Sequence, residues 1–183
     1  MRVIAGKARS LPLRCPEGLD TRPTTDRIKE TLFNILQPYL PGSVFLDLCS
    51  GSGGIGIEAI SRGAKRAYFV ENAPKAVKCI QENLNFTKFA DQAVLLKQDV
   101  VSALYGIHEK EADVIFMDPP YQSQLMEPVL DALSQAPYVT QETLVVLEAE
   151  LRKDFSFAGD YGFEVVREKR YKTNKHVFLK KCE

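Results

Sequence analysis

The sequence predicts an α/β fold in which a mostly parallel, seven-stranded sheet carries helices on both faces and ends in an antiparallel hairpin. Short apolar runs alternate with helix-like segments through the middle of the chain, a pattern typical of parallel strands joined by crossover helices. The runs are nearly continuous in Val, Ile, Leu and Phe, as strands buried on both faces are. The last apolar segment has no helix between its two halves, which indicates an antiparallel pair.

The first predicted element is a helix over residues 24–36, TTDRIKETLFNIL. Either Thr24 or Thr25 can cap its first turn, because a side-chain hydroxyl can accept one of the backbone N–H groups left unpaired there. Apolar residues recur at helical spacing, so one face would pack on the sheet. That face would hold Ile28, Leu32, Ile35 and Leu36.

The sheet and its helices follow in alternation. Two prolines bear on the helices: Pro74 stands at a first-turn position, where proline is tolerated, and Pro128 interrupts the last helical pattern. The final hairpin would turn near Thr173 and Asn174. Strands are predicted at residues 44–49, 67–71, 93–99, 113–118 and 143–150, helices at 54–63, 74–86 and 124–135, and the hairpin at 163–181.

Length and composition indicate one globular domain over residues 1–183. No apolar run approaches the roughly 20 residues that cross a bilayer, and the first residues lack the apolar stretch of a signal peptide. We therefore expect no membrane contact and a cytoplasmic location. The four cysteines include no C-x-x-C pair, which favours free thiols over a zinc site or a disulfide framework.

The formal net charge is zero, but the charges are distributed unevenly. Residues 1–30 hold seven Lys or Arg against four Asp or Glu, and residues 165–183 hold seven against two. Basic ends on an acidic body suit a polyanion bound at one surface through phosphate contacts. Charged ends that serve only solubility are the competing interpretation.

A glycine-rich loop, DLCSGSGGIG, follows the first predicted strand. Gly51, Gly53 and Gly56 fit G-x-G-x-x-G between a strand and a helix, where glycines let a ligand approach the backbone. The next strand ends in Glu71, which is 20 residues after Gly51. An acid at this spacing can accept hydrogen bonds from ribose hydroxyls, so a ribose-containing cofactor is predicted.

Both a nicotinamide dinucleotide and S-adenosylmethionine fit such a loop, and Asp47 favours the second. A carboxylate inside a strand end is costly unless it meets a cation or donors. The α-amino group of the methionine part would satisfy Asp47, whereas a pyrophosphate would be repelled. A carboxylate that only caps local amides is the alternative. Asp99 could accept the amine of adenine, cap a helix, or do both.

The stretch VIFMDPPYQS places Asp118, Pro119, Pro120 and Tyr121 at the end of the fourth strand, beside the expected methyl group. An exocyclic amine of a base is a poor nucleophile until acceptors draw on its hydrogens. Asp118 and a carbonyl near Pro119 could be those acceptors, the prolines stiffen the loop, and Tyr121 offers a face on which a base can stack. A proline turn that merely ends the strand is the alternative.

Taken together, these motifs resemble the class I S-adenosylmethionine-dependent methyltransferases, whose Rossmann-like fold matches the predicted elements. RPTTDRIKETLFNIL, FLDLCSGSGGIGIEAISRGA and FMDPPY are similar to the RsmD type of bacterial 16S ribosomal RNA guanine-N2 methyltransferase. The resemblance implies an N-terminal basic strand and helix extension over 1–40, a catalytic core over 41–183, and methyl transfer to one guanine of 16S rRNA in the assembling 30S subunit.

The resemblance also implies roles for individual residues. We expect a monomer without a metal. The target base would meet Asp118, Pro119, Pro120 and Tyr121. The cofactor would meet Asp47, Ser50, Gly51, Gly53, Gly56, Glu71, Asn72, Asp99 and Val100. RNA would meet Arg9, Arg22, Arg27 and Lys172.

Other chemistries have less support in the sequence or stay open as alternatives. His108 and His176 lie far apart in the sequence, so neither a Ser/His/Asp triad nor a histidine metal site is indicated. Cys49 beside the glycine loop is better explained as a small buried side chain than as a nucleophile. DPPY alone does not identify the methylated amine, which could also belong to an adenine or to a glutamine side chain. A dinucleotide-dependent dehydrogenase or a cofactor-free RNA-binding module could have the same fold.

Overall fold

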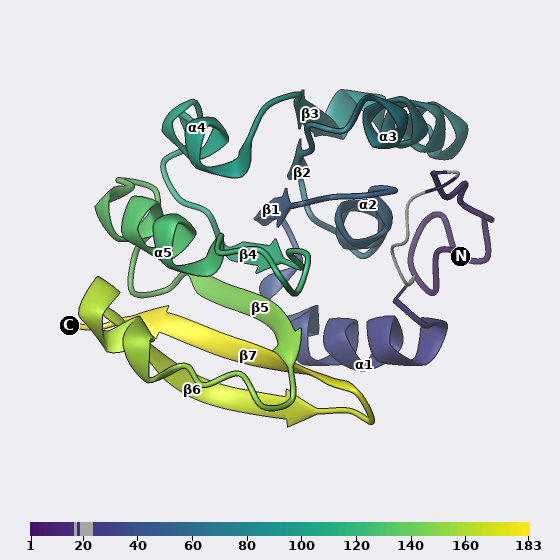
Figure 1. The fold of residues 1–183 in the computed structure, drawn as a ribbon. Helices are drawn as coiled ribbons and strands as arrows, with labels where there is room; N and C mark the ends of the chain where they lie inside the picture. Colours follow the sequence, from purple (N-terminus) through teal and green to yellow (C-terminus); the bar gives the residue numbers. More distant parts are fainter. Residues whose placement is uncertain (17, 19–23) are drawn as a thin grey trace.

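In the computed structural model, residues 1–16, 18 and 24–183 are described, and they contain a seven-stranded sheet (Figure 1). The strand order is β3-β2-β1-β4-β5-β7-β6. The first five strands in this order are parallel, and β7 runs antiparallel to both β5 and β6. This arrangement confirms the predicted fold class, including the antiparallel hairpin at the end of the chain.

The elements have the following bounds. The strands are β1 Val44–Leu48, β2 Arg66–Val70, β3 Ala93–Leu96, β4 Val114–Met117, β5 Leu144–Glu150, β6 Phe163–Arg170 and β7 Asn174–Lys181. The α-helices are α1 Asp26–Leu36, α2 Gly54–Ser61, α3 Pro74–Thr87, α4 Val100–Tyr105 and α5 Met126–Gln135. Three short 3-10 helices are η1 Gln37–Tyr39, η2 Ala90–Gln92 and η3 Ser156–Tyr161.

Helices cover both faces of the sheet. On one face, α1, α2 and α3 pack against aromatic side chains such as Phe45, Phe69 and Phe116. On the other face, α4, α5 and η3 pack against alternate strand residues such as Leu46 and Ile115. Successive side chains of a strand point to opposite faces, which is why both faces of these strands are apolar in the sequence. Figure 1 shows the two helical layers on either side of the strands.

Local capping explains where the helices begin. Thr25, rather than Thr24, caps α1, because its hydroxyl accepts the N–H of Ile28 at 3.3 Å. Pro128 does not break α5, since it stands in the first turn, where its missing N–H would have had no partner. The helix α4 was not among the predicted elements, because six residues are too few to display a helical pattern.

Several strands are shorter than predicted, and the difference positions acidic residues. The strand predicted at 93–99 ends at Leu96, because the polar residues after it leave the sheet and are exposed. The strand predicted at 113–118 ends at Met117. Asp99 and Asp118 therefore follow strands instead of ending them, and their backbones are free to turn toward a ligand.

The N-terminal segment is held to the core by a buried carboxylate. Glu58 on α2 accepts the N–H groups of Ile4 and Ala5 at 2.8 and 3.0 Å and pairs with Arg62 at 2.8 Å. Lys29 of α1 lies 3.6 Å from the same carboxylate. The predicted basic strand is reduced to one antiparallel bridge, between Arg2 and Pro12, because the next residues of the segment, Ile4 and Ala5, donate to Glu58 of α2 instead of continuing the ladder.

Two further features concern the whole described chain. Within residues 1–16, 18 and 24–183, none of the helices combines the length and apolarity needed to cross a membrane. The four cysteines are free thiols, of which only Cys79 is fully buried.

Candidate active site

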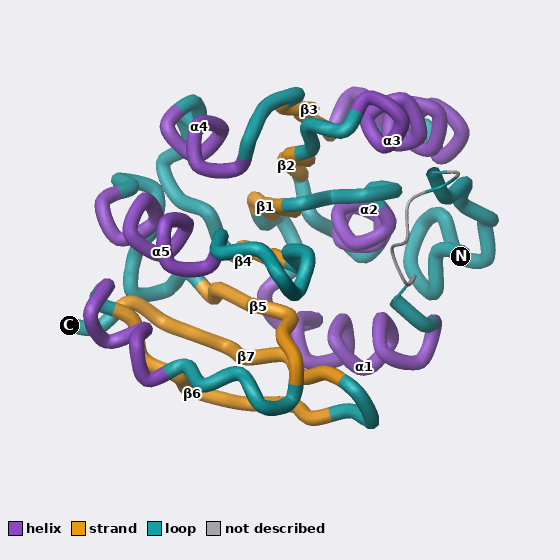
Figure 2. The backbone as a smooth tube through the Cα atoms, viewed as in Figure 1, coloured by secondary structure: helices purple, strands orange, loops and turns teal. Residues whose placement is uncertain are grey.

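The carboxyl ends of β1 and β4 form the point at which the strand order reverses. The sheet extends from β1 through β2 to β3 on one side, and the chain then returns to add β4 on the other side. In open sheets of this kind, ligands bind beyond the strand ends at this point, because the two loops diverge there. The loops that follow β1 and β4, drawn in teal in Figure 2, are therefore the first candidates for a binding site.

The loop after β1 leaves space beside its backbone. Gly51 and Gly53 have φ of +56° and +79°, values that side-chain-bearing residues rarely adopt. A Cβ atom at Gly51 would meet nothing within 4 Å, so a ligand could approach this backbone closely. Gly56 has a packing role instead, because a Cβ atom there would lie 2.4 Å from Cε1 of Phe69.

Glu71 ties the glycine loop to the end of β2. Its Oε2 atom accepts the N–H of Gly51 at 2.9 Å, and its Oε1 atom accepts those of Asn72 and Ala73 at 2.9 and 3.0 Å. The N–H of Ser50 donates to the last residue of β2 at 3.0 Å and holds the loop from the other side. A carboxylate has about four acceptor sites, and three are used here, so Glu71 can still accept from one ribose hydroxyl.

Asp47 is a carboxylate inside β1 and is 1% exposed. Its Oδ2 atom accepts the N–H of Gly56 at 2.9 Å, so the local capping considered from the sequence does occur. Burial raises the pKa of Asp47 well above its usual range, and the charges of Glu71 and Asp118 raise it further, against the effect of the Gly56 hydrogen bond. A cation next to Asp47 would stabilise its charged form.

Asp99 caps α4 at the end of the loop that follows β3. Its Oδ1 atom accepts the N–H of Ser102 at 3.0 Å, and this hydrogen bond lowers the pKa of the exposed carboxyl. Val100, the first residue of α4, is buried beneath it. Capping thus fixes the position of a carboxylate that remains open to solvent, as contact with an adenine amine would require.

The DPPY residues begin immediately beyond β4. Asp118 is half-buried, Pro119 is buried, and Pro120 and Tyr121 are exposed, with 53% of Tyr121 accessible. Burial raises the pKa of Asp118 to about 7, and the neighbouring charge of Glu148 contributes. An acceptor and an exposed ring thus lie next to each other in a loop that two prolines stiffen.

Acidic groups dominate the electrostatics of this edge. The charges that act on Asp47 come from Glu71 and Asp118, and the charge that acts on Asp118 comes from Glu148. Four successive strands of the sheet, β2, β1, β4 and β5, contribute these four carboxylates. Such a cluster repels anions and favours a positively charged ligand.

Cys49 has no feature of a nucleophile. Burial raises the pKa of its thiol to about 12, and the nearby carboxylates, first among them Glu71, raise it further. A reactive cysteine needs the opposite environment, one that stabilises the thiolate. Its φ of +60° fits the tight turn with which the glycine loop begins.

Three side chains at this edge were not predicted from the sequence as site residues: Glu148, Asn174 and His176. Glu148 accepts from Asn174 Nδ2 at 2.7 Å and pairs with His176 Nε2 at 2.9 Å. One signal could have found the first of them, since Glu148 is a charged residue inside the apolar run LVVLEAE. Neither His176 nor His108 was assigned to a triad or to a metal site from the sequence. His176 is fully buried, whereas His108 is exposed.

The residues expected to contact RNA are dispersed. Arg9 lies in the N-terminal segment, Arg27 in the first turn of α1 and Lys172 in the turn between β6 and β7, and all three are exposed. Arg22 lies outside the described residues. The β6–β7 turn adjoins the carboxyl end of β5, because Glu150 pairs with Asn174. Lys172 is therefore at the same edge of the sheet as Asp118.

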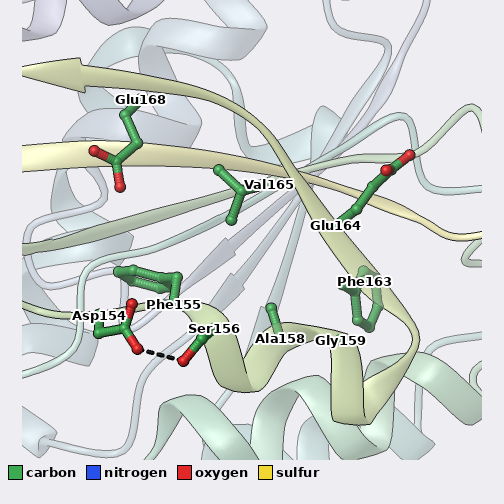
Figure 3. A pocket seen from close by; sticks show the side chains of 9 residues that line it. All are labelled: Asp154, Phe155, Ser156, Ala158, Gly159, Phe163, Glu164, Val165 and Glu168. Carbon is green, nitrogen blue, oxygen red and sulfur yellow. Dashed lines mark hydrogen bonds between the residues drawn. The ribbon is translucent and has the colours of Figure 1, made fainter.

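A separate hollow lies between η3 and β6 (Figure 3). Asp154, Glu164 and Glu168 stand around it, and Asp154 accepts a hydrogen bond from Ser156. This hollow lies along β6, the edge strand of the sheet, and none of the candidate site residues lines it. Within the part of the chain that the structure describes, no group of His, Cys, Asp and Glu is arranged to hold a metal ion.

Comparison with known proteins agrees with this geometry. The family described as conserved hypothetical protein 95 matches residues 1–180. The ribosomal RNA small subunit methyltransferase D of Haemophilus influenzae is 36% identical over 173 residues, covering 92% of this chain and 88% of that protein. Its namesake from Escherichia coli is 33% identical over 151 residues, covering 82% and 75%.

A solved structure leads to the same assignment. The structure of a candidate methyltransferase, yhhF from Escherichia coli, superimposes with a TM-score of 0.83 at 29% identity and covers 100% of this chain and 98% of that one. The match includes both the parallel core and the final hairpin, since it spans the entire chain. Fold, glycine loop, DPPY residues and relatives agree, and the chain therefore belongs to the RsmD-type family of methyltransferases.

Proposed function

We propose that this protein uses S-adenosylmethionine to methylate the exocyclic N2 of one guanine in 16S ribosomal RNA. The observation that carries the proposal is the cluster of carboxylates at the switch point of the sheet. S-adenosylmethionine has a positive sulfonium and a positive α-amino group, so it suits this cluster. A nicotinamide dinucleotide would bring the negative charges of a pyrophosphate to the same carboxylates.

The cofactor would lie along the glycine loop. Asp47 would accept a hydrogen bond from the α-amino group, Glu71 from a ribose hydroxyl, and Asp99 from the adenine amine, while the open space at Gly51 allows close approach to the backbone. When bound, the cofactor supplies an electrophilic methyl group. Ser50, Gly56, Asn72 and Val100 would act mainly by holding the backbone of these loops in place.

The target base would lie against the DPPY loop. Asp118 and the Pro119 carbonyl would accept the two hydrogens of the exocyclic amine and so turn its lone pair toward the methyl group. Tyr121 is exposed enough to stack on a base, and Pro120 keeps the loop rigid. N2 can reach this loop only if the guanine leaves its stack, so base extrusion is expected.

The RNA target is inferred from the relatives, whose names specify small-subunit ribosomal RNA. Arg9, Arg27 and Lys172 are exposed and would contact phosphates, as would Arg22. Contacts of this type position an RNA without reading its sequence. We further propose that the enzyme acts as a monomer, without a metal, on the assembling 30S subunit in the cytoplasm.

One transfer experiment tests cofactor, base and substrate together. Small subunits that lack the modification are incubated with S-adenosylmethionine carrying a labelled methyl group, with stripped 16S RNA in parallel. We expect the label in N2-methylguanosine, with a higher yield on subunits. Label in N6-methyladenosine would show that the target base is adenine and not guanine. No label on either RNA, together with intact cofactor binding, would refute the RNA assignment and direct the search to DNA or to protein glutamine.

The Asp47→Asn variant tests the electrostatic argument directly. We expect cofactor affinity to fall about 30-fold or more, the typical effect of losing one partner of a buried charge pair. The protein without cofactor should become more stable at neutral pH, because the cost of a buried charge is removed. Calorimetric titration and thermal melting measure the two effects.

Asp113→Asn is the matched control for this substitution. Asp113 accepts the N–H of Val44 at 2.8 Å at the opposite end of the sheet, so its loss should change stability without changing cofactor affinity. Equal affinities in wild type and Asp47→Asn would contradict the role assigned to Asp47.

A further inference from the structure

A buried hydrogen-bonded cluster lies directly behind the DPPY loop. Glu148 of β5 accepts from Asn174 Nδ2 at 2.7 Å and pairs with His176 Nε2 at 2.9 Å. The other ring nitrogen of His176, Nδ1, lies 3.1 Å from the hydroxyl of Tyr171. Glu148, Asn174 and His176 are 6%, 4% and 0% exposed. Both oxygens of one buried carboxylate are thus occupied by side chains of the final hairpin.

The sheet register places this cluster beside Asp118. Met117 pairs with Leu147 in the parallel β4–β5 ladder, so the next residues along the two strands are Asp118 and Glu148. In the antiparallel β5–β7 ladder, Glu148 pairs directly with His176. The cluster therefore connects the hairpin to the residue at which the proposed chemistry occurs.

The ionisable groups around Asp118 come from every strand packed against it. Asp47 and the thiol of Cys49 face it from β1 and its loop, and Glu148 faces it from β5. His176 and Tyr171 stand behind Glu148. Only His176 can be cationic among these groups, and it is paired with Glu148, so the groups that face Asp118 directly are acidic.

Glu148 has the features of a group held in place to influence its neighbour. A buried carboxylate is costly unless donors satisfy it, and Asn174 and His176 provide those donors. Occupied on both oxygens, Glu148 cannot itself rotate to meet a substrate. What it can do is act on Asp118 through its charge, because a like charge nearby makes a carboxylate bind a proton more tightly.

We propose that Glu148, held by His176 and Asn174, is a positioning residue that strengthens Asp118 as the acceptor for the amine during methyl transfer. This proposal rests on the proposed methyltransferase function. It adds a residue outside the DPPY and glycine motifs, and it explains why two buried polar side chains of the hairpin, Asn174 and His176, converge on one carboxylate.

The proton balance of the reaction makes such an acceptor useful. The amine nitrogen forms a bond to the methyl carbon, and the carbon–sulfur bond breaks with its electron pair going to sulfur. The nitrogen then carries one proton in excess and a positive charge. Asp118 can accept this proton and release it to solvent, and it does so more readily the more basic its carboxylate is.

The raised basicity of Asp118 has a predictable pH dependence. Burial, with a contribution from Glu148, raises the pKa of Asp118 to about 7. Only the ionised form can both accept a hydrogen bond from the amine and take up its excess proton, so activity should rise as the pH increases through about 7. Removing the Glu148 charge should lower the pKa of Asp118 and shift this rise to lower pH.

The test compares Glu148→Gln with Glu150→Gln, which removes an exposed carboxylate from the same strand. The measurement is kcat/KM for methyl transfer against pH. For Glu148→Gln, we expect the acid limb, the rise of kcat/KM on the acidic side of the profile, to shift to lower pH by about half a pH unit or more, with a lower plateau. For Glu150→Gln, we expect the acid limb to stay at the pH of wild type. Loss of structure alone would lower the plateau without moving the limb.

Further measurements keep the outcome decisive. Cofactor titration and thermal melting check that each variant is folded. Carbon NMR of the labelled Asp118 carboxyl measures its titration without any substrate. A titration midpoint unchanged by Glu148→Gln overturns this proposal. Absence of any transfer by wild type overturns the proposed function, and the NMR titration still decides the role of Glu148.

Discussion

Asp118→Ala is expected to lower kcat for methyl transfer by at least about 10²-fold, the typical effect of removing one oriented hydrogen-bond partner from an active site. Without the carboxylate, the amine loses an acceptor for one of its hydrogens, and its lone pair is no longer directed at the methyl group. The excess proton also loses its nearest receptor. Methyl-label transfer at saturating cofactor and RNA measures this effect.

Cofactor binding should survive the same substitution. Asp47 and Glu71 remain, and both belong to strands on the other side of the switch point. Titration of Asp118→Ala with S-adenosylmethionine should therefore give an affinity close to that of wild type. Asp131→Ala, which removes an exposed carboxylate from α5, is the control for loss of charge. Full activity of Asp118→Ala would refute the role assigned to the DPPY motif.

Glu58→Gln is expected to cost about 3–5 kcal/mol of the free energy of unfolding, the range for breaking a buried ion pair from one side. Glu58 is fully buried and holds the backbone N–H groups of Ile4 and Ala5 together with Arg62 and Lys29. Burial lowers the pKa of Lys29, and the charge of Glu58 opposes this shift. Without that charge, two buried cations are left facing each other.

Urea denaturation measures this loss, and Glu82→Gln is its control. Glu82 also pairs with an arginine at 2.8 Å, but Arg14 is 75% exposed in its side chain, so the pair should contribute at most about 1 kcal/mol. The melting temperature of Glu58→Gln should fall by roughly 10 °C. If the two variants unfold at the same urea concentration, the buried ion pairs of Glu58 contribute no more to stability than the exposed pair of Glu82, and the prediction is wrong.

The acidic residues of the glycine loop and of DPPY were predictable because each stands at a fixed place relative to its own strand. Glu71, Asp99 and Asp118 stand at or just beyond the ends of apolar runs, Asp47 lies one residue before the end of the first strand, and parallel strands bring their carboxyl ends to one edge. Their positions are observed at that edge. Their roles toward a cofactor and a base remain predictions.

Other residues could not be assigned from the sequence because their partners are distant in it. Lys29 and Glu58 are 29 positions apart and meet only because α1 and α2 pack on the same face of the sheet. The predicted first helix showed an apolar face, and nothing in its periodicity indicated that Lys29 would be buried with a carboxylate from another helix.

The sequence by itself determined the fold class, the order of strands and helices along the chain, and the acids that follow the strands, because period and local spacing carry that information. Only the tertiary structure decided that β7 lies beside β5, and with it that His176 meets Glu148 across 28 positions and next to Asp118. Such a contact depends on which strands become neighbours and in which register they pair. The register is determined by the burial of apolar side chains on both faces of the sheet.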